Sequence, residues 1–334
     1  MKAIRIVSLL AINLLLLPLN ASELKVGDKV MPKMDAKLKQ GTKNLSWQKF
    51  ALPLTVRKIQ DDWLWIGGAK VKSDHVVPLA DALGYYTEYL RDNPQSSAAY
   101  NNRGIAWSET KSYYSAIKDY TKAIKIDPNH AAAYNNRGNA WAEKEEYDNA
   151  IEDFTQAIKL DPKYVMAYKN RGLAWRLQGE YDRAIKNYTE AIKLSPKYVT
   201  IYNDRAIVWK LKGEYGNVIE DYTEVVKLDP NNKSCHNNLA WLYATCPESR
   251  YRNGKKAVEH ARKACELTDW KNDSEIDTLS AAYAEAGDFE KAIRFLDKAM
   301  KMAPEKHKVA RQKMMNLFKE GTPYRDQPIT RSSK

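Results

Sequence analysis

The feature that most constrains this chain is a strictly periodic sequence. Pro128, Pro162, Pro196 and Pro230 follow one another at one constant interval, which we call the repeat period. Aromatic residues recur in the same phase as three series: Tyr100, Tyr134, Tyr168 and Tyr202; Trp107, Trp141, Trp175 and Trp209; Tyr113, Tyr147, Tyr181 and Tyr215. Because several residue types keep one register over four blocks, the pattern indicates a solenoid of stacked supersecondary units.

The residue types within a block predict two antiparallel helices. In the second block, Gly138 and Ala150 are small where two helices must approach closely, and aromatic residues fill the space around them. The closing proline cannot continue a helix, because it lacks an N–H and clashes with the preceding turn. The full series is Tyr134, Gly138, Trp141, Tyr147, Ala150, Phe154, Ala157 and Pro162. This series closely resembles the tetratricopeptide repeat, which implies a helix-turn-helix in every block.

The resemblance implies a mainly α fold, an α–α superhelix of such repeats. Four blocks are regular, with first helices that open near Ala98, Ala132, Met166 and Thr200, and two blocks are divergent. In the fifth block, residues 247–254 lengthen the turn between the helices. The expected boundaries are a half-repeat helix at 81–94, repeats at 95–304, a capping helix at 305–320 and a disordered tail at 321–334.

One position departs from the family pattern. The usual Leu before the Gly is replaced by Arg103, Arg137 and Arg171, and the fourth block has Arg205 followed by Ala206. Such an arginine could line a surface for acidic ligands. It could also serve the structure, with its stem over apolar surface and its charged end in water.

The first residues predict export. Lys2 and Arg5 precede an apolar run from Ile6 to Leu19, which is typical of a secretory signal peptide over residues 1–21. An uncleaved membrane anchor is the alternative, although the run is short for a membrane span. We therefore expect a periplasmic or secreted protein.

Residues 22–80 are rich in β-branched and aromatic residues and predict a small all-β barrel. Strands are expected at residues 24–30, 54–56, 63–66 and 76–79, with a two-residue turn at Gly67 and Gly68. The strand order, the pair Trp63 and Trp65 and the closing Val-Val-Pro-Leu resemble a Src-homology-3-like module. In such a module the two tryptophans could bind an extended peptide, or pack in the core.

The formal charge of +12 lies at the two ends of the chain. Lys2 and Arg5 carry +2, residues 22–80 carry +5 and residues 289–334 carry +7, whereas residues 81–288 carry −2. A nucleic-acid-binding protein would usually show a basic stripe along its binding face. We therefore predict no nucleic-acid partner, and interpret the basic ends as solubilising or weakly attracted to an anionic envelope.

No pattern of catalytic or metal-binding residues is present. The five histidines lie in separate segments, and His236 stands where the other blocks have Tyr, which predicts a packing role. No nucleophile elbow, phosphate loop, HExxH or Cys/His cluster occurs. We expect no enzyme activity and no cofactor. Cys235 and Cys265 could pair and leave Cys246 in the turn, or all three could be small buried hydrophobic residues.

The resemblance implies that the first helices line a concave groove that receives an extended peptide or a helix. Asparagine recurs at one depth, and its amide can both donate to and accept from a peptide backbone; a polar helix face that only prevents aggregation is the alternative. By repeat position the groove candidates are Asn101, Ile105 and Ser108; Asn135, Asn139 and Glu143; Lys169, Leu173 and Arg176; Asn203, Ile207 and Lys210.

The family's two-carboxylate clamp is incomplete here. Asn139 and Asn170 match two of its places, but Asn135 stands where Lys is needed, and Thr200 and Asp204 stand where Lys and Arg are needed. Recognition of chaperone C-termini is therefore disfavoured. The sequence predicts a non-catalytic scaffold that binds a partner protein or peptide in this groove. The alternative is an envelope-attachment protein that binds cell-wall polymer or anionic lipid through its barrel and basic tail. Whether the solenoid pairs with itself is left open.

Overall fold

The computed structural model describes residues 24–40, 43–45, 52–66 and 68–327. The chain divides at residues 146 and 147 into two compact units, which are presented separately. The predicted signal peptide at residues 1–21 lies outside the described residues. No helix of the described residues is long and apolar enough to cross a membrane.

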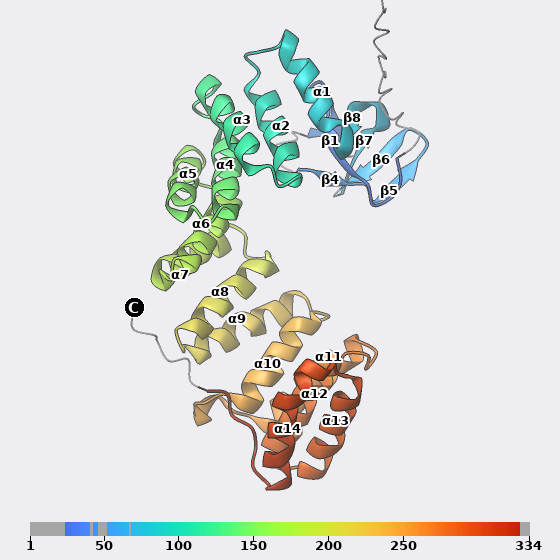
Figure 1. Ribbon diagram of the computed structural model, residues 1–334, viewed down its shortest axis with the longest axis vertical. Helices are drawn as coiled ribbons and strands as arrows, with labels where there is room; N and C mark the ends of the chain where they lie inside the picture. Colours follow the sequence, from blue (N-terminus) through green and yellow to red (C-terminus); the bar gives the residue numbers. More distant parts are fainter. Residues whose placement is uncertain (1–23, 41–42, 46–51, 67, 328–334) are drawn as a thin grey trace, which may run out of the picture. The chain divides into compact units, whose positions relative to one another are not determined.

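The first unit begins with two small antiparallel sheets (Figure 1). One has the order β4-β1-β8 and the other the order β3-β2-β7-β6-β5. The strands are β1 Lys29–Pro32, β2 Leu38–Gln40, β3 Lys43–Leu45, β4 Leu54–Thr55, β5 Lys58–Gln60, β6 Trp63–Ile66, β7 Ala69–Lys72 and β8 Val76–Pro78. The predicted β region is thus confirmed, but these residues form no closed barrel.

Two details of the predicted strands change. The expected strand at residues 24–30 is β1, which starts only at Lys29, because Gly27 (φ 104°) lies in a turn before it. The expected hairpin after β6 is present, since Ile66 pairs with Ala69 and the turn residue Gly68 has φ 82°; Gly67 lies outside the described residues. Strands β2, β3, β5 and β7 were not predicted, and β2, β3 and β5 have only three residues each, which are too few to show alternation of polar and apolar residues.

The β region packs against the first helices of the same unit. Met31 and Val77 share a buried cluster with Tyr86 of α1 (Leu79–Asp92) and Ala99 of α2 (Ser97–Glu109). The Tyr86 hydroxyl donates a 2.5 Å hydrogen bond to the carbonyl oxygen of Pro32 in β1. The β region therefore covers the apolar face that the first helix pair would otherwise expose.

Helix pairs make up the rest of the described chain. The predicted first helices open at Ser97, Ala131, Val165 and Val199, each one residue before its expected start. The first unit continues with α3 Tyr113–Ile126 and α4 Ala131–Glu143. The second unit contains α5 Tyr147–Leu160, α6 Val165–Leu177, α7 Tyr181–Leu194, α8 Val199–Leu211, α9 Tyr215–Leu228, α10 Lys233–Thr245, α11 Gly254–Leu267, α12 Asp273–Glu285, α13 Phe289–Met302 and α14 Glu305–Lys319.

Small residues set how closely the two helices of a pair approach. A Cβ atom built on Gly104 of α2 would lie 2.6 Å from the Tyr120 ring of α3. A Cβ atom on Gly172 of α6 would lie 3.0 Å from the Tyr188 ring of α7. Contacts this short are repulsive. The tyrosine ring of the second helix therefore fits only because the first helix has a glycine, with no side chain, at this position.

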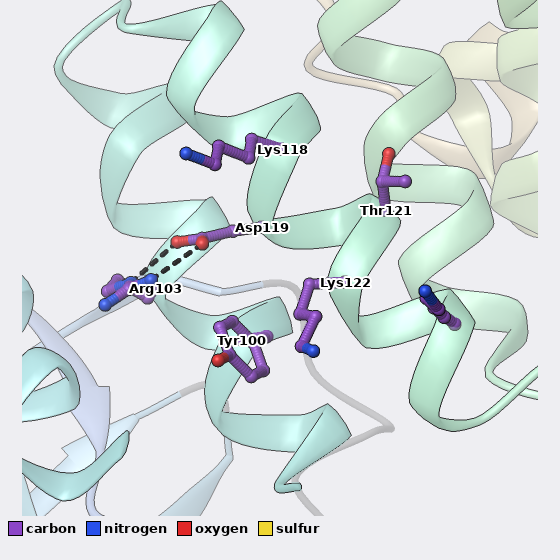
Figure 2. Close-up of a pocket in the computed structure, with 7 residues that line it drawn as sticks. Tyr100, Arg103, Lys118, Asp119, Thr121 and Lys122 are labelled. Carbon is purple, nitrogen blue, oxygen red and sulfur yellow. Dashed lines mark hydrogen bonds and ion pairs between the residues drawn. The ribbon is translucent and has the colours of Figure 1, made fainter. Parts of the chain in front are cut away.

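The arginines that replace the family's Leu are structural. Arg103 donates from Nε and one Nη to both carboxylate oxygens of Asp119, at 2.7 and 2.8 Å (Figure 2). Arg205 binds Asp221 in the same way, at 3.0 and 2.6 Å. In the third block the partner is Asn187, which accepts one bond of 2.8 Å from Arg171. These pairs join the first helix of a repeat to its second.

The other Nη of each arginine reaches the preceding repeat. It donates to a threonine hydroxyl on the helix before, over distances of 2.8 to 3.3 Å. The pairs are Arg103 with Thr87, Arg137 with Thr121, Arg171 with Thr155, and Arg205 with Thr189. A Leu at this position could pack but could not join three helices by hydrogen bonds.

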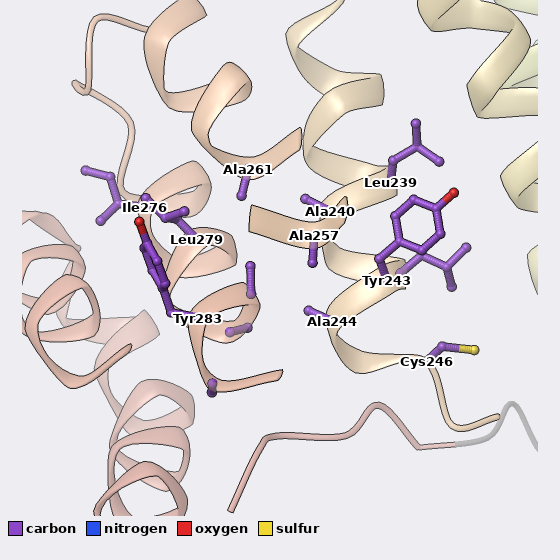
Figure 3. Packing of buried hydrophobic residues seen from close by; sticks show 14 of the residues in the cluster. Leu239, Ala240, Tyr243, Ala244, Cys246, Ala257, Ala261, Ile276, Leu279 and Tyr283 are labelled. Carbon is purple, nitrogen blue, oxygen red and sulfur yellow. The ribbon is translucent and has the colours of Figure 1, made fainter. Parts of the chain in front are cut away.

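The fifth and sixth repeats form the largest buried cluster of the second unit (Figure 3). Cys235, Cys246 and Cys265 are all buried in this cluster with free thiols. The interpretation as small hydrophobic residues is confirmed, and the alternative pairing of Cys235 with Cys265 is not found. The lengthened turn of the fifth repeat contains a short 3-10 helix at Ser249–Tyr251.

Candidate protein-binding groove

The groove candidates of the first unit are mostly used inside the fold. Asn101 and Asn135 are 6% and 5% exposed. The Asn136 amide donates to Oδ1 of Asn101 at 3.0 Å, which ties α4 to α2. Ile105 packs beside the cluster that contains the β region, whereas Asn139 is exposed. Asn101 therefore joins two adjacent repeats, Asn135 is buried, and Asn139 is exposed to solvent.

The candidates of the second unit are more accessible. Ile207 of α8 is 41% exposed, Lys210 is exposed, and Leu173 and Arg176 of α6 are half-buried. Lys169 of α6 forms an ion pair with Asp204 of α8, at 3.6 Å between Nζ and Oδ2. Asn203 Oδ1 lies 3.3 Å from the Cys235 sulfur and accepts from its thiol. This part of the candidate groove presents apolar and basic side chains.

Asp204 also bears on the two-carboxylate clamp. Burial raises the pKa of its carboxyl group, and the nearby Lys169 and Arg176 oppose that rise. Because Lys169 is paired with a carboxylate of the fold itself, it offers less charge to a carboxylate of a ligand. The absence of Lys and Arg at the remaining clamp positions has the same consequence.

His236 in the fifth repeat takes over the hydrogen bond of the tyrosine that it replaces. The Tyr202 hydroxyl donates to the Pro196 carbonyl oxygen at 3.0 Å, and His236 Nε2 donates to the Pro230 carbonyl oxygen at 3.1 Å. With Nε2 protonated, Nδ1 of neutral His236 accepts the 3.0 Å bond from Nδ1 of His260. The predicted packing role is confirmed, with a polar partner that the pattern did not indicate.

The candidate groove continues onto α10 at positions fixed by the repeat period. Trp241 follows Ile207 by one period, Ala244 follows Lys210 by one period, and Thr245 follows Glu143 by three periods. We call these three residues, together with Glu285 at the end of α12, the terminal groove site. The sequence analysis did not select these residues, because the fifth repeat diverges from the family pattern. Counting one repeat period forward from Ile207 would have identified Trp241.

The chain's own C-terminal segment lies on the terminal groove site. The sequence predicts a disordered tail from residue 321, but residues 322–327 pack against α10 and α12, and the pale red coil below Ala244 in Figure 3 is this segment. Asp326 Oδ2 accepts a 2.8 Å bond from the Trp241 indole and lies 3.3 Å from the Thr245 hydroxyl. The Asp326 backbone N–H donates to the Thr245 carbonyl oxygen at 2.9 Å.

Tyr324 and Arg325 complete this contact. The Tyr324 ring lies 5.9 Å from the Trp241 ring, centroid to centroid. One Nη of Arg325 donates to the Ala244 carbonyl oxygen at 3.2 Å, and the other lies 2.6 Å from Oε2 of Glu285. Glu285 also faces Arg252, at 3.4 Å. Residues 324–326 of the predicted tail therefore contact α10 and α12 through an aromatic ring, two charged side chains and one backbone N–H.

A shallow cavity of about 430 Å³ between α2 and α3 is lined mainly by lysines, Tyr100 and the Arg103–Asp119 pair (Figure 2). Its two most buried charged groups already bind each other. Within the part of the chain that the structure describes, no three His, Cys, Asp or Glu side chains are placed to hold a metal ion.

These features define a helical-repeat protein with paired helices of constant length. The tetratricopeptide repeat model matches residues 97–130, 131–164 and 165–198, and a second tetratricopeptide repeat model matches residues 278–306. The chain therefore contains tetratricopeptide repeats. A comparison with curated protein sequences finds no match.

One solved structure confirms the helical-repeat fold, and two others are reported for their similarity in sequence. The C-terminal part of a TPR repeat-containing protein from Cytophaga hutchinsonii is similar with a TM-score of 0.59 and 18% identity, over 70% of this chain and 93% of that one. MamA from Desulfovibrio magneticus has a TM-score of 0.44 and 22% identity, over 46% of this chain and 87% of that one. The first TPR of Spaghetti, bound to an HSP90 peptide, has a TM-score of 0.34 and 25% identity, over 34% and 90%.

Proposed function

We propose that this protein is a non-catalytic scaffold of the cell envelope, which binds an extended segment of a partner protein along the first helices of its repeats. The carrying observation is that an extended segment already lies on the terminal groove site. It contacts Trp241, Ala244 and Thr245, which stand at the repeat positions of Ile207, Lys210 and Glu143. On α8 these positions are the exposed Ile207 and Lys210, and on α6 they are the half-buried Leu173 and Arg176.

The test is affinity capture from the native envelope fraction, with Ile207→Asp beside a matched control. Leu194 at the end of α7 is 39% exposed, close to the 41% of Ile207, but it lies on a second helix outside the candidate groove. We expect Ile207→Asp to lose the partner and Leu194→Asp to retain it. Equal capture by both variants would contradict binding in the groove.

A second candidate function, attachment to an anionic envelope polymer or lipid, is supported by one face of the larger sheet. Strand pairing places four residues in one row across β2, β7, β6 and β5: Lys39, Lys70, Trp65 and Lys58. In the neighbouring row on the same face, Lys72 pairs with Trp63. Lys70 lies 4.4 Å from the Trp63 ring centre and Lys58 lies 5.0 Å from that of Trp65. Leu64 and Ile66 point to the buried side.

This sheet face combines lysine ammonium groups with two half-buried tryptophans, which suits an anionic surface. We expect Lys70→Glu to release the full chain from vesicles that contain phosphatidylglycerol, or from purified cell wall. Lys186→Glu on α7, an exposed lysine outside this sheet face, should leave that binding unchanged. Retention of both variants would exclude this face. The tail contributes less than its charge suggests, because Arg325 is paired with Glu285.

A further inference from the structure

The tail segment is held on the terminal groove site by few contacts. Pro323, Tyr324, Arg325 and Asp326 are only half-buried, and Gln327 is exposed. One backbone hydrogen bond, from Asp326 to Thr245, joins the segment to α10. A segment with so little buried area opens at low free-energy cost compared with the buried helices around it.

The site selects a chemistry as well as an extended shape. The Trp241 indole can only donate, so it requires an acceptor, and the Asp326 carboxylate supplies one. Glu285 and the Ala244 carbonyl oxygen can only accept, and the Arg325 guanidinium donates to or faces both. The Tyr324 ring lies beside Trp241, so the site also accepts an aromatic side chain. The site thus binds three consecutive residues of the tail, which are aromatic, basic and acidic in that order.

Removal of the tail would take one partner from each of these groups. Glu285 would keep Arg252 at 3.4 Å, whereas the Trp241 indole would lose its carboxylate acceptor. A polar group that loses its hydrogen-bond partner destabilises the empty site unless water or another ligand replaces that partner. An incoming segment of the same chemistry would restore the same bonds. Replacement of the tail by such a segment is therefore more favourable than opening of the tail to leave the site empty.

We propose that the tail is a displaceable occupant of the terminal groove site, and that the partner segment which replaces it is an extended peptide with consecutive aromatic, basic and acidic residues. This inference rests on the proposed function, since it names the chemistry of one part of the same groove. The tail then lowers the apparent affinity of the site for every incoming peptide, and a peptide with this series is the one that can replace its bonds.

The experiment uses a fluorescent peptide of residues 321–327 and measures its anisotropy with the full chain and with its Arg325→Ala/Asp326→Ala variant. A short tether holds its ligand at an effective concentration of about 1 mM, so a peptide with a Kd of about 0.1 mM should bind the variant about tenfold more tightly. The unchanged chain should bind the peptide more weakly because its own tail competes for the same site.

Three controls separate the outcomes. A peptide with Ala at the position of Asp326 should bind neither protein, and Trp241→Phe added to the double variant should abolish binding by removing the indole donor. Equal affinity for both proteins would overturn the inference. So would a double variant that melts at lower temperature and binds no peptide, because the tail would then be a permanent cap.

The inference and the proposed function fail independently. If Ile207→Asp loses the captured partner while the tail peptide binds neither protein, the groove function stands and the displaceable tail is refuted. If the peptide binds as expected while Ile207→Asp and Leu194→Asp capture the partner equally, the terminal groove site binds peptides but the partner does not use α8.

Discussion

The arginine pairs between helices give a prediction that can be worked out in detail at Asp221. This residue is 2% exposed, and its two carboxylate oxygens accept both hydrogen bonds from Arg205. Asp221→Ala would leave the half-buried guanidinium with Thr189 alone. Breaking a buried ion pair by removing one partner costs about 3 to 5 kcal/mol, and we expect about 3 because the Arg205 side chain is 18% exposed.

The third repeat supplies the matched control. There Asn187 stands in place of Asp and still accepts a 2.8 Å bond from Arg171. Asp221→Asn should therefore keep one bond and lose the other, at a cost of about 1 kcal/mol.

Hydrogen exchange of the α8 and α9 amides is the suitable assay, because repeat arrays can open segment by segment. At about 1.4 kcal/mol per factor of ten, Asp221→Ala should accelerate exchange roughly 100-fold and Asp221→Asn roughly fivefold. Equal acceleration by the two variants would refute the reasoning, since it would mean that the bond retained by the amide oxygen of Asp221→Asn contributes nothing.

Three further outcomes follow from packing and burial. Gly172→Ala should lower the free energy of unfolding by about 1 to 3 kcal/mol in urea denaturation, because its Cβ would press on Tyr188; Gly84→Ala in α1, where nothing lies within 4 Å, should raise it by about 1 kcal/mol, and the opposite order would contradict this account. Burial and the neighbouring His236 lower the pKa of His260, so the folded state binds fewer protons than the unfolded state below pH 6.5. Stability should therefore fall as pH drops from 6.5, and His260→Phe should flatten that slope in melting curves from pH 7.5 to 5. Burial raises the pKa of the Cys235 and Cys265 thiols to about 12, so both should resist iodoacetamide at pH 8 until urea unfolds the chain; rapid alkylation of the folded protein would show that they are accessible.

Much of the fold could be predicted because the repeat period imposes the same local rules on each block. Every block places a small residue, an aromatic series and a proline at fixed intervals, so the first helices were expected within one residue of their starts at Ser97, Ala131, Val165 and Val199. The short strands β2 and β3 could not be found, because three residues are too few to show alternation. Barrel closure was expected from order and composition, but strand pairing through space decides it.

The candidate groove was predictable in position and not in role. Counting by the repeat period places Asn101 and Ile207 on equivalent faces of first helices. Asn101 is nevertheless buried and accepts a hydrogen bond from Asn136 of the next repeat, whereas Ile207 is exposed. The two alternatives for Arg103 and Arg205 likewise required the second helix of each repeat, which supplies Asp119 and Asp221.

By itself, the sequence determines the repeat, the helix boundaries and the packing of the small and aromatic residues, because these depend on contacts within one repeat period that recur in every block. The tertiary structure alone decides what the tail does. Asp326 lies 85 residues from Trp241 in the chain. No local pattern in residues 321–334 indicates that Arg325 and Asp326 have hydrogen-bonding or charged partners on α10 and α12.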